Sequence, residues 1–132
     1  MFFMKKKPDV LKILKSALNC ELEKIKVWNE QTFTGATLAG QLAKLEEELR
    51  EADKAESYEE QANEMADIMI VLGGLRRWDS NVGKFFEGAI WEKANIGGLC
   101  DLLCRIKLKM DINRSRTWGE PKDGAYHHTN NE

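Results

Sequence analysis

The feature that most constrains this chain is its lack of proline. Only Pro8 and Pro121 occur, and the more than one hundred residues between them contain none. Proline interrupts helices because it lacks a backbone donor and clashes with the preceding turn, so its absence favours helix. Leu, Ala, Glu and Lys, all good helix formers, dominate the same stretch. We therefore predict an all-α bundle of four to five helices. The length of 132 residues fits one domain, residues 1–132, with an irregular tail from about residue 118.

Capping residues and apolar spacing divide this stretch into segments. Asp9 and Thr37 are candidate caps for the first two helices. Ser57, followed three residues later by Glu60, is a capping-box pattern that begins a third helix, extending to about Arg77. The third segment is apolar over a wide arc, which is typical of a central helix, and the pair 73–74 would allow close helix contact. A fourth helix is predicted from Ser80–Asn81 across Phe85 and Phe86, and a fifth from after Gly97–Gly98 to about Arg116.

Charge and cysteine content limit the classes of partner. The formal net charge is −2, from 20 basic and 22 acidic residues, which gives no signal for nucleic acid or an anionic membrane. No apolar run approaches membrane-spanning length. Three cysteines and no secretion signal predict a cytoplasmic protein. We expect Cys20, Cys100 and Cys104 to be buried structural thiols, since Cys100 and Cys104 with His127 and His128 match no zinc spacing.

Two pairs of carboxylates stand out. Glu48 and Glu51 are three residues apart on the second predicted helix, and Glu64 and Asp67 are three apart on the third. Residues at this spacing share a helix face, and an antiparallel hairpin would bring the pairs together. Four clustered carboxylates repel one another unless a cation neutralises them, and oxygen ligands suit Mg²⁺ or Mn²⁺. The alternative is a solvated acidic face. Asp67 favours the metal hypothesis because it lies in an apolar stretch, where a charge needs a partner.

A basic and aromatic group lies near the end of the fifth predicted helix. Lys109, Asn113 and Arg116 are spaced four and three apart and share a face, and Trp118 follows closely. Lysine and arginine can bind phosphates, and asparagine can bond a base or sugar edge. The alternative is that these cations simply complement the helix dipole. Trp28 and Phe33 could stack on a base, although core packing is their default role.

The ordered set of motifs resembles the MazG-like pyrophosphohydrolases. Glu48-x-x-Glu51 resembles the first metal-binding element of that family, and Glu64-x-x-Asp67 resembles the second. The stretch from Lys109 through Asn113 and Arg116 to Trp118 is similar to the family's distal signature. Residues 28–33 are also similar to a subgroup that includes phage-type dATP/dGTP pyrophosphohydrolases. The resemblance extends over roughly residues 28 to 128.

The resemblance implies hydrolysis of a nucleoside triphosphate between its α and β phosphates, giving a monophosphate and pyrophosphate. It implies metal ligation by Glu48, Glu51, Glu64 and Asp67, with Mg²⁺ as the cofactor and Mn²⁺ as a substitute. Glu48 and its neighbour Glu47, as helper or base, take the catalytic role. The implied substrate-binding residues are Lys109, Asn113, Arg116 and Trp118.

Two other functions stay open from the sequence. One is a related pyrophosphohydrolase acting on phosphoribosyl-ATP or a modified nucleotide, and the other is a helical assembly module without catalysis. We also expect a homodimer or a dimer of dimers, because a small bundle does not easily hide its large aromatic residues. These are Trp28, Phe85, Phe86 and Trp91.

Overall fold

The computed structural model describes residues 9–81 and 96–129 of the chain. These residues form four helices: α1 (Val10–Thr32), α2 (Leu38–Asp53), α3 (Tyr58–Leu75) and α5 (Ile96–Ser115). The predicted all-α bundle is confirmed. Most of the predicted fourth helix, including Phe85 and Phe86, lies outside the described residues, and so does Trp91.

The helix starts follow from the capping side chains. Asp9 accepts a hydrogen bond from the backbone of Lys12, Thr37 from Gly40 and Ser57 from Glu60, at 3.1, 3.0 and 3.1 Å. Each cap satisfies one of the donors that the first helical turn leaves free. Two helix boundaries differ slightly from their predicted positions. Helix α3 ends at residue 75 rather than at about residue 77, and residues 97–98 lie in the first turn of α5 instead of preceding it.

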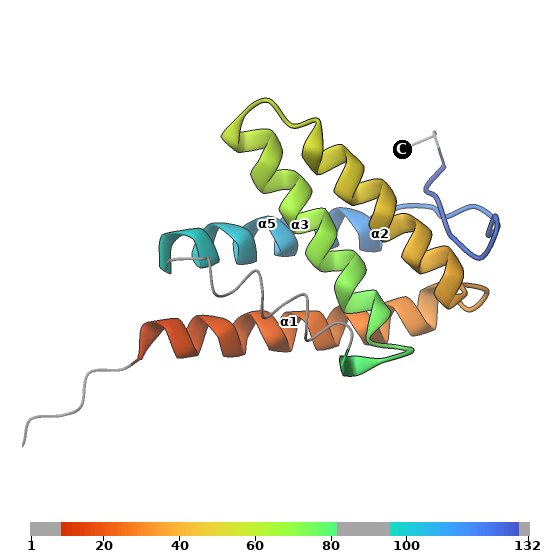
Figure 1. Ribbon diagram of the computed structural model, residues 1–132. Coiled ribbons are helices and arrows are strands. Elements are labelled where there is room, and N and C mark those ends of the chain that lie inside the picture. Colours follow the sequence, from red (N-terminus) through yellow and green to blue (C-terminus); the bar gives the residue numbers. More distant parts are fainter. Residues whose placement is uncertain (1–8, 82–95, 130–132) are drawn as a thin grey trace, which may run out of the picture.

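Helix α3 occupies the centre of the bundle, as its wide apolar arc predicts. It contacts α1, α2 and α5, and it forms an antiparallel hairpin with α2 (Figure 1). The core consists of aliphatic residues and methionines from all four helices: Leu18, Leu22, Ile25, Leu45, Ala66, Ile68, Met69, Leu72, Leu75, Leu99, Leu102, Ile106 and Met110. Because α3 touches every other described helix, its polar residues are held in a defined place.

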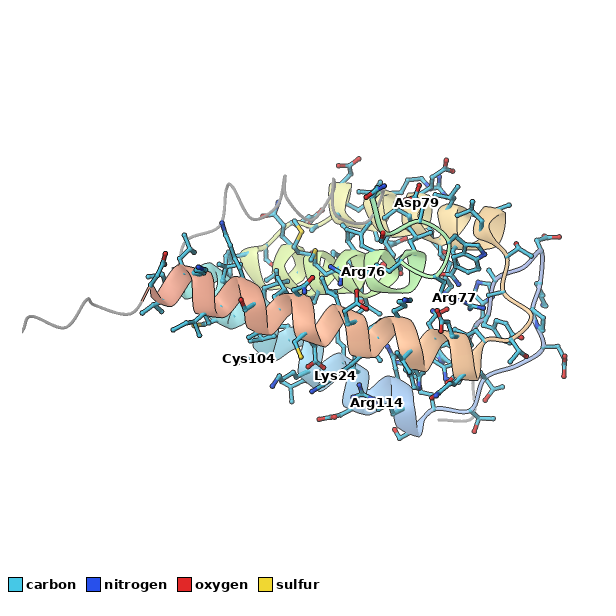
Figure 2. The ribbon with its side chains drawn as sticks, turned by 90° about the horizontal axis from the view of Figure 1, so that it is seen from below. Lys24, Arg76, Arg77, Asp79, Cys104 and Arg114 are labelled. Carbon is cyan, nitrogen blue, oxygen red and sulfur yellow. The ribbon has the colours of Figure 1, made fainter. Side chains whose placement is uncertain are left out.

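The end of α3 lies against α1, as the glycine pair predicts. A Cβ atom added to Gly74 would lie 2.7 Å from Nδ2 of Asn29, so a larger residue would require the Asn29 side chain to shift. The two arginines that follow α3 also reach α1 (Figure 2). Arg76 is buried and binds Glu23 at 2.7 Å, and Arg77 donates to Oδ1 of Asn29 at 2.7 Å. These contacts fix α3 along α1.

The segment after α5 folds back on the bundle as a C-terminal turn, residues 117–129. Isolated β-bridges join Trp118 to His128 and Lys122 to Ala125, and Gly124 closes the turn with a φ of 75°. The hydroxyl of Tyr126, a buried residue, accepts a hydrogen bond from the backbone of Gly35 at 2.8 Å. The sequence predicted only irregular structure here. Long-range contacts with the α1–α2 connection order this segment (Figure 1).

The cysteine prediction was wrong. Cys20, Cys100 and Cys104 are all exposed. On α5 the buried positions belong to Leu99, Leu102 and Ile106, and this leaves the thiols on the outer face. In the described part of the chain, no helix has both the length and the apolarity that crossing a bilayer requires.

Candidate active site

The α2–α3 hairpin brings three of the four predicted metal ligands together. One carboxylate oxygen from each of Glu48, Glu64 and Asp67 lies within 4.8 Å of the others. All three residues are partly buried. The three-residue spacing places Glu64 and Asp67 on one face of α3, and the antiparallel pairing places Glu48 of α2 opposite them. We call these three residues the acidic triad.

The other two predicted carboxylates lie beside the triad rather than in it. Glu51 forms an ion pair with Lys54 at 3.8 Å, and about half of its side chain is exposed. Its charge nevertheless contributes to raising the pKa of Glu64. Glu47 is exposed and lines the neighbouring cavity. The ligand role of Glu51 and the helper role of Glu47 therefore stay predictions.

The carboxylates of the triad raise one another's pKa values. Burial, and then the charges of Asp67 and Glu64, raise the pKa of Glu48 to about 7, while nearby Lys44 acts in the opposite direction. Burial and the charge of Asp67 also raise the pKa of Glu64. Among the described residues, Oε2 of Glu64 is buried without a hydrogen-bond partner.

A divalent cation fits this arrangement. Three carboxylates supply the hard oxygen ligands that Mg²⁺ and Mn²⁺ prefer, and the buried Oε2 of Glu64 has an unused lone pair. Lys109 of α5 is a positive charge already at the triad, with its Nζ 3.0 Å from Oδ1 of Asp67. Three carboxylates with one paired lysine still carry an excess of negative charge, so a second cation would stabilise the triad.

A cavity of about 490 Å³ adjoins the acidic triad. The triad members Glu48 and Asp67 line it, and so do all four predicted substrate-binding residues, Lys109, Asn113, Arg116 and Trp118. Arg116 donates to Oδ1 of Asn113 at 3.2 Å, and the indole of Trp118 donates to the backbone oxygen of Asn113 at 3.2 Å. Asn113 thus positions both neighbours at the cavity, whereas binding of substrate by these residues stays a prediction.

Aromatic rings form the wall of the same cavity. Phe33 lies at their centre, 5.0 Å from Trp28, 4.8 Å from Trp118 and 4.6 Å from Tyr126 between ring centroids. Phe33 is buried, as core packing predicts, whereas Trp28 and Trp118 are partly exposed at the cavity. The wall joins α1, the α1–α2 connection and the C-terminal turn, and it gives the cavity an apolar surface suited to a planar ring.

Several cavity residues escaped the sequence prediction: Gln41, Lys44, Tyr126, His127 and His128. Lys44 is four residues before Glu48 and Gln41 is seven before it, so helical spacing alone would have placed both on the carboxylate face. The residues of the C-terminal turn carry no such local signal. Their position depends on long-range hydrogen bonds to the α1–α2 connection.

Carboxylates, cations and aromatic rings from the helices and the C-terminal turn therefore surround one cavity. Comparison with known proteins adds a relative. Over 101 residues, which are 76% of its length, this chain is 31% identical to a dATP/dGTP diphosphohydrolase from Salmonella phage PMBT28. The matched stretch is 28% of that protein, so this chain corresponds to less than a third of the relative's length. No protein-family model matches the chain, and no solved structure matches it.

Proposed function

We propose that this protein is a Mg²⁺-dependent nucleoside triphosphate pyrophosphohydrolase that acts on purine deoxynucleotides and cleaves between the α and β phosphates. The products are a nucleoside monophosphate and pyrophosphate. One observation carries the proposal: the acidic triad, three cationic side chains and an aromatic wall adjoin the same cavity. The dATP/dGTP diphosphohydrolase name of the phage relative supports the choice of purine deoxynucleotides.

Different side chains around the cavity would bind different parts of the substrate. Glu48, Glu64 and Asp67 would hold the cation, which supplies charge neutralisation for the phosphates and activation of a water. Lys44, Lys109 and Arg116 would stabilise negative charge on the phosphate oxygens. The exposed Glu47 at the cavity is available to accept a proton from the attacking water. Trp28 and Trp118 would contact the base.

The proposal is tested by measuring pyrophosphate release from each common NTP and dNTP, with and without Mg²⁺. We expect release from dATP and dGTP that chelation abolishes. Asp67→Asn keeps the shape of the side chain but removes a charge, so it should reduce turnover at least a hundredfold. Asp101→Asn, which alters an i,i+4 pair with Arg105 on the outer part of α5, is the matched control.

Other outcomes would contradict the proposal. Parental turnover in the Asp67→Asn variant would remove the acidic triad from catalysis. Release of pyrophosphate only from phosphoribosyl-ATP or a modified nucleotide would place the chain in a different substrate class. If no nucleotide is hydrolysed or bound, a non-catalytic helical assembly module is the better description.

A further inference from the structure

We propose that Gln41 recognises the edge of the purine base, and that its amide accepts both 6-amino and 6-oxo purines. This inference deepens the proposed function and rests on it. The phosphate-binding and metal-binding roles discussed above do not involve Gln41.

Gln41 is a buried polar residue at the wall of the cavity. The residue is 3% exposed and lines the cavity. Its backbone N–H donates to the carbonyl of Thr37 at 3.0 Å, which continues α2. In the described regions no hydrogen bond involves its side-chain amide, yet its amide atoms are not among the fully enclosed, unpartnered ones. The amide can therefore be reached from the cavity, where it can bond water or a ligand, and a hydrogen-bonding ligand would replace that water.

The position of Gln41 along α2 places it at the base end of the cavity. Gln41, Lys44 and Glu48 are spaced i, i+3 and i+7, and all three line the cavity. The helical rise puts Gln41 about 10 Å from Glu48 along the axis. That separation leaves room for phosphates and a sugar between the acidic triad and Gln41. The neighbouring Gly40 lies against the backbone of the C-terminal turn, next to the turn's contribution to the aromatic wall.

A carboxamide suits purines because it presents a donor and an acceptor side by side. With adenine, the NH₂ group of Gln41 would donate to a ring nitrogen while its oxygen accepts from the 6-amino group. With guanine, the amide would turn over: its NH₂ group would donate to the 6-oxo oxygen and its oxygen would accept from the ring N1–H. Since no described protein group holds the amide in one orientation, both orientations are available.

The test measures the binding of non-hydrolysable α,β-imido nucleotides in the presence of Mg²⁺. Tryptophan fluorescence reports the binding. The chain is compared with Gln41→Leu and with Gln61→Leu, a change at an exposed glutamine of α3 outside the cavity. The ligands are the α,β-imido analogues of dATP, dGTP and purine deoxyriboside triphosphate, which lacks the 6-substituent, together with inorganic tripolyphosphate. Thermal unfolding verifies that each variant is folded.

We expect the parental chain to bind the dATP and dGTP analogues with similar affinity and the unsubstituted purine about tenfold more weakly. In Gln41→Leu this tenfold preference should disappear, while affinity for tripolyphosphate stays within about twofold. Equal losses for all ligands, including tripolyphosphate, would overturn the base-recognition role. A preference unchanged by Gln41→Leu would overturn it as well. Failure of the parental chain to bind any nucleotide would instead overturn the proposed function.

Discussion

At the scale of single residues, Glu64 has the least satisfied side chain in the acidic triad. Its Oε2 is buried without a hydrogen-bond donor. Glu64→Gln supplies an amide that can donate to Glu48 and removes one of three repelling charges. We expect the metal-free protein to gain about 1 kcal/mol of unfolding free energy. Thermal unfolding measures this gain, with Glu46→Gln on the exposed face of α2 as the control.

The same variant should lose the stabilisation that Mg²⁺ gives the parental chain, because one ligand charge is gone. A metal-free variant less stable than the parent would show that Glu64 already has a partner. It would then argue against a cation site at the triad.

The raised pKa of Glu48 predicts how stability depends on pH. Above pH 4.5 the unfolded chain releases this proton, whereas the folded chain keeps it up to about pH 7. The folded state therefore binds more protons, and the free energy of unfolding falls as the pH rises from about 4.5 through about 7. Thermal midpoints of the metal-free protein between pH 5 and 8 measure this decline. In Glu48→Gln the decline should be shallower, and an unchanged slope would assign it to other groups.

Lys109 of α5 lies next to the acidic triad. Its position predicts that its removal changes Mg²⁺ binding and nucleotide binding in opposite directions. Its Nζ is 3.0 Å from Oδ1 of Asp67, so it competes with a cation for that carboxylate. Lys109→Met should tighten Mg²⁺ binding without nucleotide several-fold and weaken nucleotide binding about tenfold. Calorimetric titrations with each ligand test both effects. Weaker Mg²⁺ binding in the variant would mean that Lys109 supports the cation site instead of competing for it.

At the scale of elements, the junction between α2 and the C-terminal turn depends on a missing side chain. A Cβ atom on Gly40 would overlap the backbone carbonyl of Gly124 and lie 2.8 Å from the backbone nitrogen of Ala125. Gly40→Ala should therefore destabilise the protein by about 1–3 kcal/mol and displace the turn. Nucleotide binding should weaken with it, because Tyr126 and Trp118 belong to the aromatic wall.

The control for this prediction is Gly119→Ala, where a Cβ atom would make only ordinary contacts, the nearest at 3.7 Å. Thermal unfolding and tryptophan fluorescence compare the two variants. Equal stability of Gly40→Ala and the parent would show that the turn does not dock on α2 as closely as described.

At the scale of the whole molecule, we predict self-association into a dimer or a dimer of dimers. Three of the four aromatic residues that first suggested it, Phe85, Phe86 and Trp91, lie outside the described residues. The described helices add a separate reason, because Leu108 and Ile112 lie one turn apart on α5 with exposures of 65% and 52%. Sedimentation should give at least twice the mass of one chain. The double change Leu108→Glu with Ile112→Glu should shift the protein towards monomer, and a parental monomer at high micromolar concentration would contradict the prediction.

The sequence by itself determined the local features of this protein. Asp9, Thr37 and Ser57 cap the helices that they were predicted to cap, because capping depends on a side chain and a backbone donor three residues away. The wide apolar arc placed α3 at the centre, since a helix that is apolar over a wide arc must be covered by several neighbours. The convergence of Glu48 with Glu64 and Asp67 was also predictable, because a short connection between two helices forces an antiparallel hairpin.

Only the tertiary structure decided which side chains face the cavity. Glu48 and Glu51 share a helix face. The rotation of α2 against α3 nevertheless places Glu48 in the acidic triad and leaves Glu51 beside Lys54. The pairing of Lys109 with Asp67 depends on how α5 packs, and the burial of Gln41 beside the C-terminal turn joins segments about eighty residues apart in sequence. Such contacts leave no local periodicity, because they are set by packing the whole core and not by the repeat of a single helix.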